Sequence, residues 1–271
     1  MKKKVIVTGG TGYIGSHTAV ELIADGFEVV IIDNLYNSDV SVLDGIQAIT
    51  GIRPKFYDYD ICDRSKLNEV FLAEGRIDAI IHFAAYKAVG ESVHKPLEYY
   101  RNNLISLMNL LDMMDQHGDP VMVFSSSCTV YGQPDVLPVT ETSPVREAAS
   151  PYGFTKQAGE IMIRDTMAAR KAQKSISLRY FNPIGAHPTA YIGELPCGVP
   201  ENLVPFITQT AIGLRNELKV FGNDYNTPDG SCIRDYLHVV DLAKAHVVAL
   251  KRLIEGRNKN NYEVFNLGTG K

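Results

Sequence analysis

The stretch TGGTGYIG, residues 8–15, follows the apolar run 5–7 and precedes a helical pattern that extends to Ala24. It fits two glycine spacings, G-x-G-x-x-G from Gly10 and G-x-x-G-x-x-G from Gly9. Either spacing leaves backbone N–H groups open at the positive end of a helix dipole, where no Cβ blocks a pyrophosphate. The stretch therefore predicts a dinucleotide site, and the alternative is a tight turn for close helix–strand packing.

A second buried strand, 28–33, follows the helix end at Gly26 and completes a βαβ unit. At its end, the Asp33 carboxylate can accept hydrogen bonds from the adenosine ribose, and its charge repels a 2′-phosphate. The next residues, NLYNSDVSV, contain no Lys or Arg to hold such a phosphate. This favours NAD over NADP, with a turn-forming Asp33 as the alternative. Asp60, at the end of the third strand, is a weaker candidate for binding the adenine amino group.

Strands and helices continue to alternate up to Tyr180. We expect strands at 55–60, 79–83, 121–124 and 175–180, and helices at 65–73, 96–117 and 151–172. The strands are continuously apolar, which is typical of a parallel sheet covered by helices on both faces. The sequence therefore predicts an α/β fold with a doubly wound, Rossmann-like parallel sheet.

After Phe181 the pattern loosens into the Pro- and Gly-rich stretch 182–200. We therefore place a domain change there. Residues 1–180 form the dinucleotide-binding domain, and residues 181–271 belong to a second, smaller, mixed α/β substrate domain. In this later region we expect helices at 202–214 and 239–254 and a strand at 262–267, and some of these segments can pack back on the first domain.

Composition excludes several classes of protein. The chain has 271 residues, 45% of them hydrophobic, and a net charge of −4, which offers no electrostatic basis for binding nucleic acid or an anionic membrane. No apolar run is long enough for a signal peptide or a membrane span. The cysteines at 62, 128, 197 and 232 are far apart, so we expect reduced thiols in the cytoplasm and no metal site.

The stretch SPYGFTK, residues 150–156, contains the spacing Y-x-x-x-K. Ser150 is a good N-cap and Pro151 suits the first helical position, so Tyr152 and Lys156 share one helix face. To act as a base near neutrality, the Tyr152 phenol needs its pKa lowered from about 10. A Lys156 ammonium and a cationic nicotinamide ring both favour the phenolate. We predict a catalytic pair, although Y-x-x-x-K also occurs by chance in many helices.

Three serines, residues 125–127, directly follow the strand 121–124. Doubly wound folds bind their ligands at this carboxyl edge of the sheet. A hydroxyl here can pass a proton between a substrate and Tyr152, and the alternative is a serine-rich strand end without a role. With the glycine loop and Asp33, the serines and the Y-x-x-x-K pair predict one NAD-dependent catalytic site, and they favour the glycine spacing that starts at Gly9.

In these motifs the chain resembles the extended short-chain dehydrogenases/reductases and, among them, the UDP-glucose 4-epimerase family. The resemblance covers essentially the whole chain. It is carried by TGGTGYIGSHT (8–18), DNLYNS (33–38), HFAAYKAVGESVHKPLEYYRNN (82–103), SSSCTVYG (125–132), SPYGFTK (150–156), LRYFNPIGAHP (178–188), VFGNDYNTPDGSCIRDYLHVVDLA (220–243) and FNLGTG (265–270).

The resemblance implies a role for each site residue. Tyr152 is the base on the sugar 4-hydroxyl, Lys156 binds the nicotinamide ribose and lowers that pKa, and Ser127 hydrogen-bonds the 4-oxygen. The implied cofactor contacts are Gly9, Gly12, Tyr13, Ile14, Gly15, Asp33, Asn34, Asn37, Ser38, Asp60, Ile61, Phe83, Ala84, Lys87, Asn102, Ser125, Tyr152, Lys156 and Phe181. The implied contacts to the UDP part of the substrate are Asn182, Asn202, Leu203 and Arg234. Ordinary alternatives are a turn residue at Asn182, a solvated charge at Lys87 and a surface ion pair at Arg234.

The implied reaction is the NAD-dependent interconversion of UDP-glucose and UDP-galactose in galactose metabolism. NAD takes a hydride from sugar C4, the hexose of the 4-keto intermediate turns about its diphosphate link, and the hydride returns on the other face. Family members are usually homodimers that pack helices such as 96–117 and 152–172 together, which we expect here. They also continue past FNLGTG, so we expect the smaller domain to be incomplete, either in a fragment or in a naturally short chain.

Three other functions share this fold or cofactor. Nucleotide-sugar 4,6-dehydratases carry an Asp-Glu pair after the serines, whereas Cys128 and Thr129 stand here and cannot serve as acid and base. A decarboxylase acting on UDP-glucuronate needs a basic site for the sugar carboxylate, and the sequence gives no clear sign of one. A non-catalytic NAD-binding protein would be expected to lack Tyr152 or Lys156, and both are present.

Overall fold

The main sheet has seven parallel strands in the order β3-β2-β1-β4-β5-β6-β9. The computed structural model describes residues 2–200 and 202–270. The strands of the main sheet are β1 (Lys4–Thr8), β2 (Glu28–Asp33), β3 (Lys55–Asp58), β4 (Ala79–His82), β5 (Val121–Ser125), β6 (Ser175–Tyr180) and β9 (Tyr262–Leu267). The strand order reverses between β1 and β4, so the doubly wound fold that the sequence predicts is confirmed.

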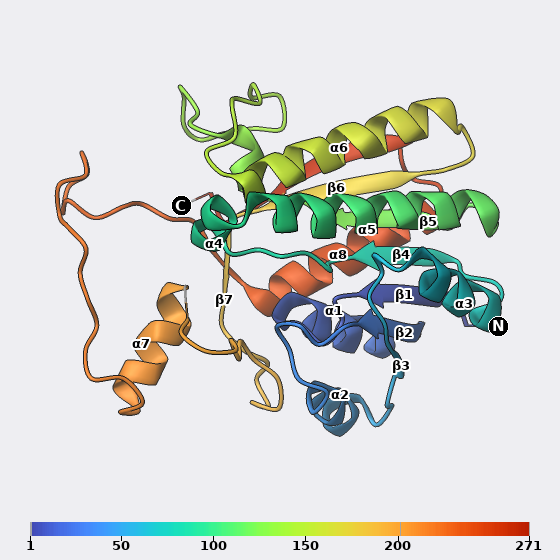
Figure 1. Ribbon diagram of the computed structural model, residues 1–271, viewed down its shortest axis with the longest axis horizontal. Coiled ribbons are helices and arrows are strands. Elements are labelled where there is room, and N and C mark those ends of the chain that lie inside the picture. The colour runs from blue at the N-terminus through green and yellow to red at the C-terminus, as the bar shows by residue number, and fades with distance from the viewer. Residues whose placement is uncertain (1, 201, 271) are drawn as a thin grey trace.

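Helices cover both faces of this sheet (Figure 1). One layer contains α1 (Tyr13–Ala24), α2 (Val42–Thr50) and α8 (Val239–Ile254). The other layer contains α3 (Arg64–Glu74), α5 (Pro96–Gln116) and α6 (Pro151–Ala169). Along β1, Val5 and Val7 join the first apolar core and Ile6 joins the second. Because successive side chains point to opposite faces, a strand buried on both faces must be apolar throughout.

Shorter elements lie beyond the carboxyl ends of the strands (Figure 1). They are α4 (Val89–His94), the 3₁₀ helix η1 (Cys128–Tyr131), α7 (Leu203–Ala211) and a two-stranded parallel sheet of β7 (Asn182–Ile184) and β8 (Tyr236–His238). They follow strands of the main sheet along the chain and surround its carboxyl edge, where the candidate site lies.

Most of the predicted elements agree with the structure. The bounds of α1, β2, β6, α8 and β9 are those expected from the sequence. Five predicted elements are too long, because β3 ends at Asp58, β4 at His82, α5 at Gln116 and α6 at Ala169, and α7 spans only 203–211. The analysis of the sequence missed α2, α4, η1, β7 and β8. Helix α2 contains Gly45, a poor helix former, which packs so closely that a Cβ would lie 2.5 Å from the Tyr191 carbonyl oxygen.

Two segments from the later part of the chain return to the main sheet. Strand β9 pairs with β6 in register from Ser175 with Tyr262 to Tyr180 with Leu267. Helix α8 packs against α1 in the same layer. Residues 239–267 therefore help to build the dinucleotide-binding half. That the segments between β6 and α8 form a separate domain, beginning at residue 181, stays a prediction.

The loop between β1 and α1 depends on its glycines. Gly9 has a φ of +70°, and a Cβ there would lie 2.7 Å from the Ala84 nitrogen. Gly12, the N-cap of α1, donates its N–H to the Gly9 carbonyl at 3.1 Å. A Cβ on Gly15 would overlap that same carbonyl oxygen, whereas a Cβ on Gly10 would first meet the side chain of Ile31. The backbone of the loop thus follows the spacing that starts at Gly9.

We expect Gly15→Ala to destabilise the protein, because the added methyl group would push α1 away from the loop after β1. Overpacking of this kind costs about 1–3 kcal/mol in the free energy of unfolding, which denaturant titration measures. Gly90→Ala is the matched control, since a Cβ there meets open space in α4. Equal stability of the two variants would contradict the contact.

Candidate active site

The Asp33 carboxylate connects the end of β2 to the glycine loop. Its Oδ2 accepts the backbone N–H of Thr11 at 3.2 Å, and its Oδ1 accepts the N–H of Leu35 at 3.0 Å. Ser38 donates to Oδ1 at 3.4 Å and shares a 2.8 Å hydrogen bond with the Thr11 hydroxyl. Asp33 thus forms the turn after β2, which is the alternative role considered for it. It also lies at the carboxyl edge of the sheet, on the strand next to the point where the strand order reverses.

The other predicted cofactor residues lie along the same edge. Tyr13 begins α1, and its phenol donates to the Gly185 carbonyl at 2.6 Å. Burial raises the pKa of Tyr13, and the Glu194 carboxylate raises it further. After β4, the Phe83 N–H donates to the Thr8 carbonyl at 3.1 Å. The remaining positions are half-buried at Ile14, Ser38, Ala84, Asn102 and Phe181, buried at Ile61 and exposed at Asn34, Asn37 and Asp60.

Helix α6 begins as the sequence predicts. The Ser150 hydroxyl accepts the Gly153 N–H at 3.1 Å, and Pro151 occupies the first turn. Tyr152 and Lys156 are both buried, at 9% and 4% exposure. The Lys156 Nζ lies 5.8 Å from the centroid of the Tyr152 ring. The structure therefore brings the predicted pair together on one buried face of the helix.

The ammonium group of Lys156 is held against the end of β5. It donates to the Ser125 carbonyl at 2.7 Å and lies 5.0 Å from the centroid of the Phe124 ring. Burial lowers the pKa of Lys156 to about 8, and the Glu160 carboxylate opposes this shift. Lys156 therefore carries its proton at neutral pH and loses it in mildly alkaline solution.

The phenol of Tyr152 is a weak acid in the protein alone, because its pKa is raised. Burial raises the pKa of its phenol, the neighbouring Tyr180 adds to the rise, and a hydrogen bond with Ser127 opposes it. In the protein alone, desolvation of the phenolate is the largest influence on this pKa, so the predicted lowering by Lys156 together with a nicotinamide ring stays a prediction. A further positive charge beside the phenol is needed to make it a base.

The three serines after β5 have three different partners. The Ser125 hydroxyl bonds the Tyr180 hydroxyl at 2.5 Å, and Ser126 donates to Glu160 Oε1 at 2.5 Å. The Ser127 hydroxyl accepts the Thr129 N–H at 3.2 Å and so caps η1. Ser127 also lies close enough to the Tyr152 phenol to oppose the rise of its pKa, and its predicted contact with the sugar 4-oxygen stays a prediction.

The carboxylate of Glu194 connects two predicted residues from different regions. It accepts from Asn202 Nδ2 at 2.5 Å and lies 3.5 Å from Lys87 Nζ. The side chain of Glu194 is 11% exposed, whereas that of Lys87 is 52% exposed. A residue predicted near the cofactor phosphates and a residue predicted to hold UDP thus lie next to each other, joined by Glu194, which the sequence did not single out.

The other residues predicted to bind the substrate have fewer contacts or are exposed. The Asn182 N–H donates to the Asp235 carbonyl at 3.0 Å, which places Asn182 where β7 meets β8. Leu203 and Arg234 are exposed. The charge of Arg234 opposes the burial that raises the pKa of Cys128, so Arg234 lies within electrostatic reach of the serines.

Asn103 is a site residue that the sequence analysis missed. It is buried in α5, where its Oδ1 accepts the Tyr86 N–H at 2.8 Å and its Nδ2 donates to the Tyr86 carbonyl at 3.0 Å. The same Nδ2 donates to the Thr155 hydroxyl at 3.0 Å. Asn103 therefore joins the segment after β4 to the catalytic helix. The sequence did carry a signal for Asn103, since its amide side chain falls on the apolar face of a predicted helix.

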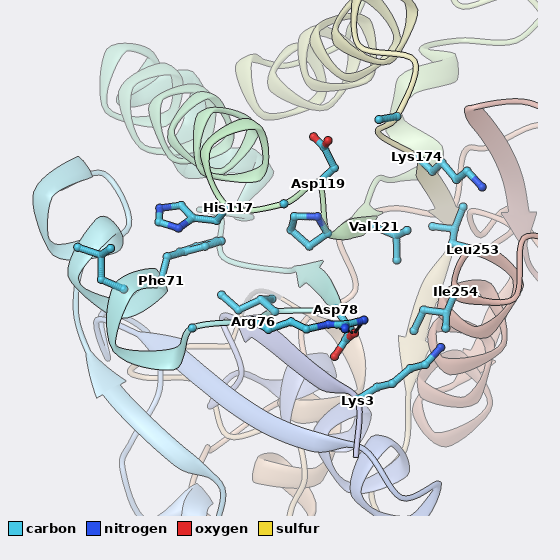
Figure 2. Close-up of a pocket in the computed structure, with 16 residues that line it drawn as sticks. Lys3, Phe71, Arg76, Asp78, His117, Asp119, Val121, Lys174, Leu253 and Ile254 are labelled. Atoms are coloured by element: carbon cyan, nitrogen blue, oxygen red, sulfur yellow. Dashed lines mark hydrogen bonds and ion pairs between the residues drawn. The ribbon is translucent and has the colours of Figure 1, made fainter. Parts of the chain in front are cut away.

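The cavity in Figure 2 lies at the opposite edge of the sheet, where the strands begin. Its volume is about 740 Å³, and Lys3, Arg76, Asp78, Asp119 and Lys174 are among the residues that line it. None of the predicted site residues lines this cavity. We therefore assign the active site to the carboxyl edge, as the chemistry of its side chains requires.

Two features are absent from residues 2–200 and 202–270. No group of three or more His, Cys, Asp or Glu side chains in these ranges is arranged to hold a metal ion. None of the helices there combines the length and the apolar run that crossing a lipid bilayer requires.

Comparison with known proteins agrees with this geometry. Residues 5–268 match the model of the NAD dependent epimerase/dehydratase family. A UDP-glucose 4-epimerase 1 from Oryza sativa subsp. japonica is 51% identical over 272 residues, with 99% of this chain and 76% of that protein covered. The UDP-glucose 4-epimerase of Bacillus subtilis (strain 168) is 50% identical over 266 residues, which cover 98% of this chain and 77% of that protein.

A solved structure shows the same likeness in three dimensions. The UDP-glucose 4-epimerase of Bifidobacterium longum, crystallised with NAD+ and UDP, aligns with a TM-score of 0.94 at 47% identity. The alignment covers 99% of this chain and 79% of that one. Since the matches extend over nearly its whole length, the chain belongs to the NAD dependent epimerase/dehydratase family and, within it, to the UDP-glucose 4-epimerases.

Proposed function

We propose that this protein interconverts UDP-glucose and UDP-galactose by transient oxidation at sugar C4, with NAD as its cofactor. The observation that carries this proposal is the buried Tyr152–Lys156 pair beside Ser127, at the same sheet edge as the glycine loop and Asp33. The relatives named UDP-glucose 4-epimerase at about half identity support it. A structural relative bound to NAD+ and UDP supports the same cofactor and the same nucleotide.

The residues of the loop after β1 fit NAD. A Cβ on Gly12 would lie 3.2 Å from the Gly9 carbonyl oxygen, so the glycines leave a concave backbone that side chains would fill. The loop stands before the N-terminus of α1, whose open N–H groups and dipole favour a pyrophosphate. Asp33 has the acceptors for ribose hydroxyls, and Lys87 provides a cation for the phosphates.

The chain's own residues divide the work of proton transfer. Bound NAD⁺ supplies a hydride acceptor for sugar C4 and a positive charge that favours the phenolate. Tyr152 removes the proton of the 4-hydroxyl, and Ser127 holds the 4-oxygen, to which Tyr152 returns the proton when C4 is reduced again. Lys156 binds the nicotinamide ribose and keeps a cation near the phenol. Asn182, Asn202, Leu203 and Arg234 hold the UDP group while the hexose turns.

The direct test is to incubate the purified protein with UDP-galactose. We expect UDP-glucose to form without net accumulation of NADH, because the hydride that leaves C4 is returned to it. Nucleotide-sugar chromatography together with absorbance at the NADH band measures both. A 4-keto-6-deoxy sugar product, released CO₂, or bound NAD without turnover would each contradict the proposal.

Replacing the base should remove activity without unfolding the protein. We expect Tyr152→Phe to lower kcat by about 10²–10⁴, since a positioned general base contributes that much, while NAD stays bound. Tyr262→Phe is the matched control, because it removes a buried phenol whose 2.9 Å bond to Ser177 lies far along β9 from the site. Retained turnover in Tyr152→Phe would remove Tyr152 as the base.

Asp33 should set the preference for NAD. Asp33→Asn keeps an oxygen for the Thr11 N–H but removes the charge that repels a 2′-phosphate. We expect the ratio of NADP affinity to NAD affinity to rise by about tenfold or more, as judged by titrating cofactor-stripped protein. Asp112→Asn, a half-exposed carboxylate on α5, is the matched control. An unchanged ratio in Asp33→Asn would assign Asp33 to the turn alone.

We further propose that two copies of the chain form a homodimer through α5 and α6. These helices pack side by side, and their outer surface exposes Leu97, Ile105 and Met108 of α5 with Phe154 and Ile161 of α6. Exposed apolar side chains on neighbouring helices favour a self-complementary, two-fold interface. We also expect the protein in the cytoplasm, a proposal that rests on its separated free cysteines.

Light scattering after size exclusion tests the dimer. We expect a mass twice the 29.9 kDa of one chain. Phe154→Glu should shift the mass to that of one chain, because it places a charge in the apolar interface. Leu72→Glu, at an exposed apolar position on α3, should leave the mass unchanged. A wild-type protein with the mass of one chain would contradict the proposal.

A further inference from the structure

Glu160 continues the line of catalytic residues along α6. Tyr152, Lys156 and Glu160 follow one another at intervals of four residues, so they share one face of the helix. All three are buried, Glu160 at 7% exposure. A carboxylate is costly to bury and requires partners. The proposed roles of Tyr152, Lys156 and Ser127 do not explain why a carboxylate is buried at position 160, next to this pair.

The carboxylate of Glu160 bridges two elements that carry the site. On β6, Arg179 donates to it twice, from Nε at 2.9 Å and from Nη2 at 2.5 Å. At the end of β5, the Ser126 hydroxyl donates to its Oε1 at 2.5 Å. Ser126 lies between Ser125, whose carbonyl holds Lys156, and Ser127, which faces Tyr152. Glu160 is therefore bonded to the segment that presents both catalytic partners.

Arg179 is fixed in turn by a second set of contacts. It donates to the Tyr131 hydroxyl at 3.0 Å and stacks 4.9 Å from the centroid of that ring. The Tyr131 hydroxyl donates to Asn266 Oδ1 at 2.6 Å. The chain of contacts thus runs from α6 through β6 and η1 to β9. Because each polar atom in it has a partner, the carboxylate of Glu160 has little freedom to move.

The electrostatic surroundings of Lys156 single out Glu160. Polar and ionisable groups from several packed elements face the Lys156–Tyr152 pair. On the helix itself and on the sheet they are Glu160 of α6, His82 of β4, the Ser125 carbonyl of β5, and Tyr180 and the Glu160-bound Arg179 of β6. The remaining two are Tyr99 of α5 and Cys128 of η1. Among the ionisable ones, Glu160 is the negative charge that raises the pKa of Lys156 against burial. Buried His82 is neutral at pH 7, because its pKa is lowered to about 3.

We propose that Glu160 is a positioning residue for the epimerase reaction, whose buried carboxylate keeps the Lys156 ammonium charged and fixes the serine segment beside Tyr152. This inference rests on the proposed function for its link to turnover. Its electrostatic part concerns the chain's own residues and can be measured without a substrate. Glu160 acts through Lys156 and Ser126 and does not itself touch the sugar.

Glu160→Gln tests the charge while keeping an amide oxygen for Ser126. The sign of the effect follows from the carboxylate, which favours the protonated lysine, so its loss lowers the pKa of Lys156 below about 8. We expect the alkaline limb of the rate–pH profile to move to lower pH by about one unit, with a rate about tenfold lower above pH 8. Glu160→Asp, which keeps the charge, should restore the position of that limb.

A second readout does not depend on turnover. Protein labelled with ¹³C at lysine Cε gives the pKa of Lys156 by NMR titration, and Lys156→Arg assigns its signal. The matched control is Glu263→Gln, which breaks a partly buried pair with Arg252, 2.7 Å long, between β9 and α8. This control should lower the melting temperature but leave both the titration and the alkaline limb unchanged.

The outcomes separate the two proposals. An inactive wild-type protein whose Lys156 titration still moves in Glu160→Gln refutes the proposed function and retains this inference. An active wild-type protein whose titration and alkaline limb stay unchanged in Glu160→Gln overturns this inference alone. Should Glu160→Gln fail to fold, Glu160→Gln combined with Arg179→Met leaves neither partner charged, and the same two readouts decide.

Discussion

Every neighbouring pair in the main sheet is parallel, and the rest of the molecule depends on this pairing. Parallel strands bring all their carboxyl ends to one edge, so the glycine loop, Asp33 and the three serines meet there although they are far apart along the chain. The reversal of strand order between β1 and β4 sends the loops on either side in opposite directions. The site is thus a consequence of topology, with its side chains supplied by the strand ends.

Burial governs the chemistry of this edge. Removing Tyr152 and Lys156 from water raises the pKa of the phenol and lowers that of the amine, so each group is driven toward its neutral form. The ion pair of Glu160 and Arg179 is buried beside them. Buried ion pairs contribute little net stability after desolvation, but they define one arrangement of the helix and strands that carry them.

Several residues serve both the fold and the proposed ligands. Asp33 closes the turn after β2 and also faces the place where a ribose would lie. Glu194 holds Lys87 and Asn202, two residues predicted to contact the cofactor phosphates and the UDP part of the substrate. Ligand binding at such positions replaces existing contacts, because buried polar groups are already paired in the protein. This dual use explains why a structural and a functional interpretation of one residue need not exclude each other.

The amino-acid sequence by itself determined the doubly wound fold and indicated Tyr152 and Lys156 as a catalytic pair. Continuous apolar strands, glycines at a fixed spacing and Ser150-Pro151 before Tyr152 act over a few residues, so their physical meaning is local. Short elements such as α2 and β7 were missed, because packing around Gly45 and pairing with β8 form them. Only the tertiary structure decided the protonation of Tyr152 and the partners of Asn103, Glu160 and Glu194. Desolvation and long-range hydrogen bonds depend on which distant segments meet, and local sequence does not encode that.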